Sequence, residues 1–128
     1  KVTEQSSPAN GATVSFGTEI IDEGGNFSGS TFTAPVTGKY LLLGYFRVNT
    51  HDQNAYAWIQ FITSNRNYEV ALWSTNHWDA SANYYPVHGY IIADMDANDT
   101  AYIKWNFNAG NAPSQISSDS YFSGCLIA

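Results

Sequence analysis

The chain has 128 residues and a mass of 14.1 kDa, which is the size of a single domain. Apolar residues make up 44% of it, so the low share of charged residues, 12%, does not indicate disorder. The net charge is −6 with only 5 Lys and Arg, which excludes a nucleic-acid-binding protein. No apolar run approaches 18 residues, so we expect no insertion into a membrane.

The first twelve residues are polar and include Pro8, Asn10 and Gly11. We expect residues 1–12 to form an arm or a connection to an upstream segment. Because the sequence begins at Lys1 and not at Met, we interpret it as an excised domain or a processed product, with its anchor expected in the upstream part. Residues 13–128 are then the folded domain.

From residue 13 onward, short apolar runs alternate with clusters of Gly, Asn, Asp and Ser. The runs are rich in Val, Ile, Thr and aromatic residues, which favour strands, and the clusters are typical of turns. No stretch has a sustained helical period with caps. The pattern predicts an all-β sandwich or barrel.

The predicted strands are of two kinds. Residues 103–108 alternate apolar and polar side chains, which indicates one buried face and one face in water. Residues 40–46, 87–92 and 121–127 are largely apolar on both faces. Since a second sheet covers only one face, another subunit is a natural cover for the other. The alternative is a sheet with an exposed, aromatic-rich face.

No arrangement of residues indicates an enzyme or a cofactor. The histidines His51, His77 and His88 lack the spacing of metal ligands, and the single Cys125 provides neither a disulfide nor a zinc site. Residues 94–98, which include Asp94 and Asp96, match the opening of a calcium-loop pattern, but Asp99 stands where the pattern needs glycine and Trp105 where it needs glutamate. We therefore expect a β-turn over residues 96–99, with a surface calcium site at these carboxylates as the alternative.

The clearest candidates for ligand binding lie in residues 73–79, at the end of the apolar run that precedes a polar turn cluster. An aromatic ring, an amide, an imidazole and a carboxylate close together can stack on a sugar ring and bond its hydroxyls. Two polar loop tips, which contain His51 and Arg66, are also suited to recognition. The alternative is that Trp73 ends a strand in the core and Trp78 packs over the end of the sandwich. The candidate ligand-binding residues are Trp73, Asn76, His77, Trp78, Asp79, Arg66 and His51.

His88 lies in one of the strands that are apolar on both faces. If that strand lines a symmetry axis, copies of His88 could make assembly sensitive to pH. A hydrogen-bonded histidine in the interior is the alternative, and it is the one we expect.

Three segments of the sequence carry a distinctive spacing of residues. Residues 26–42 read NFSGSTFTAPVTGKYLL, with aromatic, proline, glycine and tyrosine residues before an apolar strand. Residues 120–127 read SYFSGCLI, and residues 90–103 form a hydrophobic–turn–hydrophobic pattern before them. Together these segments resemble the central strand, the closing strand and the preceding hairpin of the globular head of complement C1q and its relatives. Cys125 departs from that family, because a large aromatic residue often stands there.

The resemblance implies a ten-stranded jelly roll like that of tumour necrosis factor, assembled as a compact homotrimer. It implies an inner sheet with strands at 39–48, 84–94 and 120–128, and an outer sheet with strands at 55–63, 67–74 and 100–107. The inner strands are those already identified as apolar on both faces. The predicted trimer interface contains Tyr40, Leu42, Tyr45, Tyr85, His88, Tyr90, Tyr121 and Cys125.

The resemblance also implies a non-enzymatic binding head outside the cell or on a virion surface. Low charge and loops rich in Asn and Ser are more similar to phage and bacterial members than to antibody-binding heads. Our hypothesis is the C-terminal tip of a viral or phage fibre, or of a bacterial surface protein, that binds a host glycan or protein receptor. The alternatives are a structural trimerisation cap of a fibre and a secreted signalling or innate-immune ligand.

Overall fold

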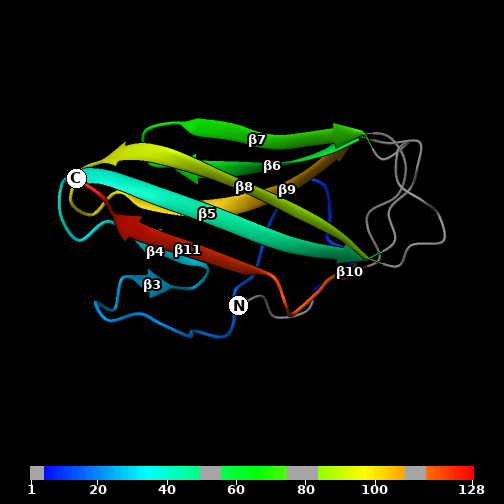
Figure 1. Cartoon of the computed structure of the whole chain (residues 1–128), viewed down its shortest axis with the longest axis horizontal. Helices are drawn as coiled ribbons and strands as arrows, with labels where there is room; N and C mark the ends of the chain where they lie inside the picture. The colour runs from blue at the N-terminus through cyan, green and yellow to red at the C-terminus, as the bar shows by residue number, and fades with distance from the viewer. Residues whose placement is uncertain (1–4, 50–55, 75–83, 109–114) are drawn as a thin grey trace.

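The computed structural model describes residues 5–49, 56–74, 84–108 and 115–128. These residues form two stacked β-sheets and no helix (Figure 1). The strands are β1 (Gln5–Ser6), β2 (Ala12–Thr13), β3 (Phe27–Ser28), β4 (Thr31–Thr33), β5 (Gly38–Asn49), β6 (Tyr56–Thr63), β7 (Asn67–Ser74), β8 (Tyr84–Met95), β9 (Thr100–Asn108), β10 (Gln115–Ile116) and β11 (Tyr121–Leu126). Within the described ranges, no helix is long and apolar enough to cross a membrane.

Each sheet is built around one long central strand. In the first, which we call the β5 sheet, β5 pairs with β8 on one side and with β10 and β11 on the other, and β1 pairs with β10. In the second, the β9 sheet, the order is β3-β4-β9-β6-β7, and β2 also pairs with β9. All pairs are antiparallel. The predicted all-β sandwich and the predicted division of strands between two sheets are therefore confirmed (Figure 1).

The core lies between the sheets and takes alternate residues from each strand, as the period of two requires. On β5 the even-numbered side chains point inward, and Tyr40 and Leu42 are buried there. On β8 the odd-numbered side chains point inward, and Ile91 and Ala93 are buried there. Strand β9 buries Ile103 and Trp105 and leaves its polar residues at the surface, except for Asn106, whose amide donates to Gln60 Oε1.

A bulge in β7 turns an extra side chain into this core. Two residues of β7, Ala71 and Leu72, lie opposite Trp58 of β6, and Ala71 has a φ of 51°. The extra residue shifts the alternation, so Val70 and Trp73 both pack against the core although their numbers differ in parity. The Trp73 ring lies 5.3 Å from that of Trp105.

The described part of the predicted N-terminal arm is integrated into the sandwich. Gln5 of β1 pairs with Ile116, and Ala12 of β2 pairs with Trp105. Backbone bonds from Gly11 and from Val14 to strand β9 continue this contact. Residues 5–12 therefore contribute short strands to both sheets.

Candidate functional site

The outer surface of the β5 sheet is apolar over most of its length. Because the even residues of β5 and the odd residues of β8 fill the core, the remaining parities face outward, and the register sets Leu43 beside Tyr90 and Leu41 beside Ile92. Tyr90 is 67% exposed and Ile92 is 59% exposed. We call this surface the apolar face, which consists of Leu41, Leu43, Tyr45, His88, Tyr90, Ile92, Tyr121 and Cys125.

Ion pairs stand at the two ends of the apolar face. At one end Lys39 Nζ lies 4.0 Å from Asp94 Oδ1. At the other end Arg47 forms an ion pair with Asp119, and its guanidinium lies 3.8 Å above the ring of Tyr84. Between them β5 runs for about 26 Å, eight residues at about 3.3 Å each, with no charged side chain on this face.

Aromatic rings order the middle of the face. Tyr45 stacks on Tyr121 of the neighbouring strand, with ring centroids 5.3 Å apart and planes at 22°. On the other side of Tyr45 lies His88, its partner in the register. A continuous, exposed and uncharged surface of this kind is typical of a protein–protein interface.

The structure corrects part of the predicted trimer interface. Tyr45, His88, Tyr90, Tyr121 and Cys125 lie on the apolar face. Tyr40 and Leu42, by contrast, are 1% and 0% exposed in the core, so neither belongs to this surface. Tyr85 pairs with the buried Val48, which places it on the core side at the end of the sheet.

Sequence reasoning omitted Leu41, Leu43 and Ile92 from this surface. The alternation of side chains along each strand places Leu41 and Leu43 on the same face as Tyr45, and Ile92 on the same face as Tyr90. This alternation does not distinguish the outer face from the core in the sequence, because both faces of these strands are apolar. The expectation that His88 is an interior, hydrogen-bonded histidine is also wrong: His88 is exposed on the apolar face.

The predicted ligand-binding residues do not form one site in the described structure. Trp73 packs into the core against Trp105, as the structural alternative for it predicted. Arg66 lies in the turn between β6 and β7, at the opposite end of β7 from Trp73, about 20 Å away along the strand. The other five candidates, His51, Asn76, His77, Trp78 and Asp79, lie outside the described residues.

A hollow of about 570 Å³ opens on the outer surface of the β9 sheet. Its lining includes Tyr56 and Trp58, whose rings stack with centroids 5.6 Å apart, and the exposed Leu72. The predicted ligand-binding residue Trp73, which packs against the core, also borders this hollow. The carboxylate of Glu69 and the hydroxyl of Ser74 add polar groups to the apolar lining. Of this lining, sequence reasoning named only Trp73 and missed the other residues, because the hollow combines residues of two strands that no motif connects.

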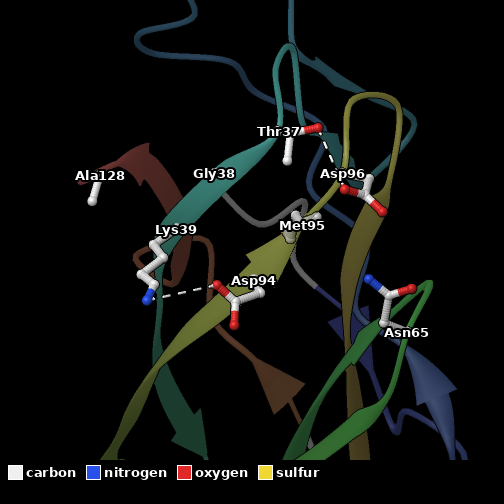
Figure 2. Close-up of a pocket in the computed structure, with 8 residues that line it drawn as sticks. All are labelled: Thr37, Gly38, Lys39, Asn65, Asp94, Met95, Asp96 and Ala128. Atoms are coloured by element: carbon white, nitrogen blue, oxygen red, sulfur yellow. Dashed lines mark hydrogen bonds and ion pairs between the residues drawn. The ribbon is translucent and has the colours of Figure 1, made fainter.

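A second hollow, of about 250 Å³, lies where the turns after β4, β6 and β8 meet (Figure 2). Figure 2 shows the Asp94 carboxylate directed toward Lys39 and that of Asp96 toward Thr37. Among the described residues, no group of three or more His, Cys, Asp or Glu could hold a metal ion. The calcium site considered for Asp94, Asp96 and Asp99 therefore has no support in this geometry.

The predicted turn over residues 96–99 is present, and Asp99 stabilises it. The backbone N–H of Asp99 donates to the carbonyl of Asp96 at 2.9 Å. Asp99 Oδ2 in turn accepts from the Asp96 N–H at 2.8 Å and from Asn65 Nδ2 at 2.7 Å. This carboxylate thus connects the β8–β9 turn to the β6–β7 turn.

Another carboxylate organises the loop before β3. Asp22 accepts hydrogen bonds from the backbone N–H groups of Asn26 and Phe27, at 2.8 and 2.9 Å. These two bonds favour the ionised form and lower the pKa of Asp22 below its ordinary value of 3.8. The bonds hold the loop in place beside the Phe27 ring, which packs against the core.

Comparison with solved structures identifies the sandwich as a jelly roll of the C1q and tumour necrosis factor type. The globular domain of zebrafish complement 1qA superposes with a TM-score of 0.73 at 17% identity, over 99% of this chain and 93% of that one. Murine APRIL superposes at 0.58 with 14% identity, over 93% and 92% of the two chains. The Eiger TNF of S. frugiperda gives 0.52 at 13% identity, over 77% of this chain and 64% of that one.

The sequence itself matches the family model described as the C1q domain over residues 1–127. No curated protein sequence matches the chain. Domains of the C1q family are non-enzymatic binding modules, are generally extracellular and typically form homotrimers. The match spans nearly the whole chain, and the predicted resemblance is confirmed: this chain belongs to the C1q domain family.

Proposed function

We propose that the chain forms a homotrimer through its apolar face and acts as a binding head. The observation that carries this proposal is the uncharged outer surface of the β5 sheet, with Tyr90 and Ile92 more than half exposed. Burying a side chain of this kind contributes about 1.5–3 kcal/mol when it is fully removed from water. Several such side chains in each protomer offset the loss of freedom on association.

The same arrangement leaves the other sheet free for a ligand. The hollow at Tyr56 and Trp58 is on the β9 sheet, on the opposite side of the sandwich from the apolar face. A trimer built on the apolar face therefore presents three copies of this hollow. Its stacked rings suit a sugar ring, and the Glu69 carboxylate suits its hydroxyl groups. Three linked copies make weak single-site binding effective.

We further propose that this head is the C-terminal tip of a viral or phage fibre, or of a bacterial surface protein, and attaches to a host glycan or protein receptor. The low charge of the chain supports this, with only 5 Lys and Arg to serve charged ligands. A structural trimerisation cap shares the same apolar face but has no ligand. A secreted signalling or innate-immune ligand shares the face and binds a receptor of its own organism.

The trimer is tested by solution mass from light scattering, at micromolar concentration and after dilution. We expect about 42 kDa for the native chain, which is three times 14.1 kDa. Ile92→Glu places a charge on the apolar face and should give a folded monomer. Leu72→Glu is the matched control, since Leu72 is also 59% exposed but lies on the other sheet. A native monomer, or equal effects of the two variants, would contradict the proposed interface.

Ligand binding is tested on a printed glycan array with the isolated trimer. A binding head should retain at least one glycan, and Leu72→Glu or Trp58→Ala in the hollow should weaken that signal while the mass stays at three copies. Binding by neither the native trimer nor the variants, on glycans or on a panel of bacterial cells, would favour the structural cap.

A further inference from the structure

We propose that His88 makes the trimer sensitive to pH, so that protonation of this side chain on acidification separates the protomers. This inference rests on the proposed trimer, because it requires the apolar face to be covered by another copy. His88 lies within that face, paired with Tyr45 across the strands and followed by Tyr90 on its own strand. A cover over these rings removes His88 from water.

No carboxylate of the described residues lies beside His88 on this face. On its own strand the nearest outward-facing one is Asp94, six residues and about 20 Å away, and Asp94 is paired with Lys39. On β11 the outward-facing side chains, those of Tyr121, Ser123 and Cys125, include no carboxylate. Among the described residues of its own protomer, a protonated His88 therefore has no counter-ion on this surface.

The charged group nearest to His88 in the register is a cation. Arg47 of β5 is the diagonal neighbour, one position beyond Tyr45 on the outer face, and it is already paired with Asp119. Asp119 is thereby engaged by an arginine that is charged at every pH of interest. A second positive charge at His88 is disfavoured by Arg47.

The remaining strands that contact β8 do not supply a partner either. Strand β6 carries no charged residue. On β7 the carboxylate of Glu69 lines the hollow on the opposite side of the sandwich, and Tyr68 packs against the core. The uncharged surroundings accept a neutral imidazole, whereas a covered imidazolium would be desolvated without compensation.

The direction of the effect follows from linkage. Acid favours the imidazolium form of a histidine in water, and an uncharged cover disfavours it, so acidification shifts the equilibrium from the trimer toward separated protomers. As an order of magnitude from the generic histidine value of about 6.5, one excluded proton per protomer weakens association by about tenfold at pH 5.5, and three copies weaken the trimer constant by about a thousandfold. The protomer concentration at half-dissociation depends on the square root of that constant, so it should rise by about 30-fold between pH 8 and pH 5.5.

The experiment is sedimentation velocity of the full chain over a dilution series at pH 8 and pH 5.5. Two variants accompany it. His88→Gln removes the titrating group and keeps a polar side chain. The double variant His51→Gln, His77→Gln leaves His88 as the only histidine of the chain. We expect the native chain and the double variant to dissociate on acidification, and His88→Gln to be equally stable at both values.

Each outcome decides a different claim. A native chain that is monomeric at pH 8 overturns the proposed trimer and this inference with it. A native trimer that is equally stable at both pH values overturns the inference alone. Loss of the pH effect in the variant His51→Gln, His77→Gln also overturns the role of His88. This measurement remains decisive even if His88→Gln assembles poorly.

Discussion

Gly89 lies where β8 packs closely against β6 and β7, and replacing it with alanine should destabilise the protein. Gly89 of β8 pairs with Gly44 of β5, and both face the core. A Cβ at Gly89 would lie 2.7 Å from Val70 Cγ2, 3.1 Å from Val70 Cβ and 3.4 Å from Ile59 Cδ1. Because Val70 Cβ is attached directly to the backbone of β7, rotating the side chain does not relieve the contact.

The magnitude follows from two opposing effects. Replacing a strand glycine with alanine reduces the entropy of the unfolded chain, which stabilises by about 0.4–1 kcal/mol where the backbone permits. Overpacking a filled core costs about 1–3 kcal/mol, because strands or side chains must shift. With contacts at 2.7 and 3.1 Å, the cost of overpacking exceeds the entropic gain. We therefore expect Gly89→Ala to lower the free energy of unfolding by about 1–2 kcal/mol.

Urea unfolding followed by tryptophan fluorescence measures this change. All variants are compared at one protomer concentration, since the stability of an oligomer depends on it. Gly124→Ala is the matched control. A Cβ there would meet Leu42 Cδ2 at 2.9 Å, which is a terminal methyl group and not a Cβ fixed to the backbone. Gly124→Ala should therefore change the free energy of unfolding by less than about 0.5 kcal/mol.

A double-mutant cycle isolates the contact itself. Val70→Ala removes Cγ2, the atom that would lie 2.7 Å from the new Cβ, and keeps the Cβ of residue 70; alone it should cost about 1–2 kcal/mol, because Val70 is only partly buried. The double variant Gly89→Ala, Val70→Ala should be more stable than the sum of the single losses by about 1 kcal/mol. Additive losses, or a Gly89→Ala variant more stable than the native chain, would refute the reasoning.

Two further predictions concern the carboxylates that hold turns. Asp22→Asn should lower the urea midpoint at pH 6 and have progressively less effect below about pH 3.8. A carboxylate whose pKa is lowered by folding stabilises above its unfolded pKa and loses that contribution as the pH falls through the folded value. A difference that stays constant down to pH 2.5 would contradict this. Asp99→Ala should cost about 1–2 kcal/mol in urea unfolding, because two hydrogen bonds are lost, and Asn65→Ala, which removes one of them, about half as much. Equal losses would contradict the bridging role of Asp99.

The sequence by itself determined the class of fold and the grouping of the strands. The alternation in residues 103–108 identified a strand with one buried face, and the structure buries Ile103 and Trp105 there. The segments at 26–42, 90–103 and 120–127 identified the family, because proline, glycine and aromatic residues at fixed spacing encode its turns and its central strand. Such local signals are readable because they depend on the chain immediately around them.

Only the tertiary structure decided which face of the apolar strands is the core. Where both parities are apolar, the period of two carries no information on which side the partner sheet lies. For this reason the predicted interface combined Tyr40 and Leu42, which the structure buries in the core, with His88, which lies on the outer face. The choice is made by the second sheet, which packs against one parity only.

Tertiary structure also decided which candidate residues come together. Trp73 and Arg66 are only seven positions apart in the sequence, yet an extended strand holds them at opposite ends of β7. Tyr56 and Glu69 are thirteen positions apart and line one hollow, because β6 and β7 are antiparallel neighbours. A bulge at Ala71, which needs a left-handed backbone at a non-glycine residue, turns Trp73 into the core. Sequence distance thus misplaces a site whose residues are set by strand pairing, since pairing depends on contacts between distant parts of the chain.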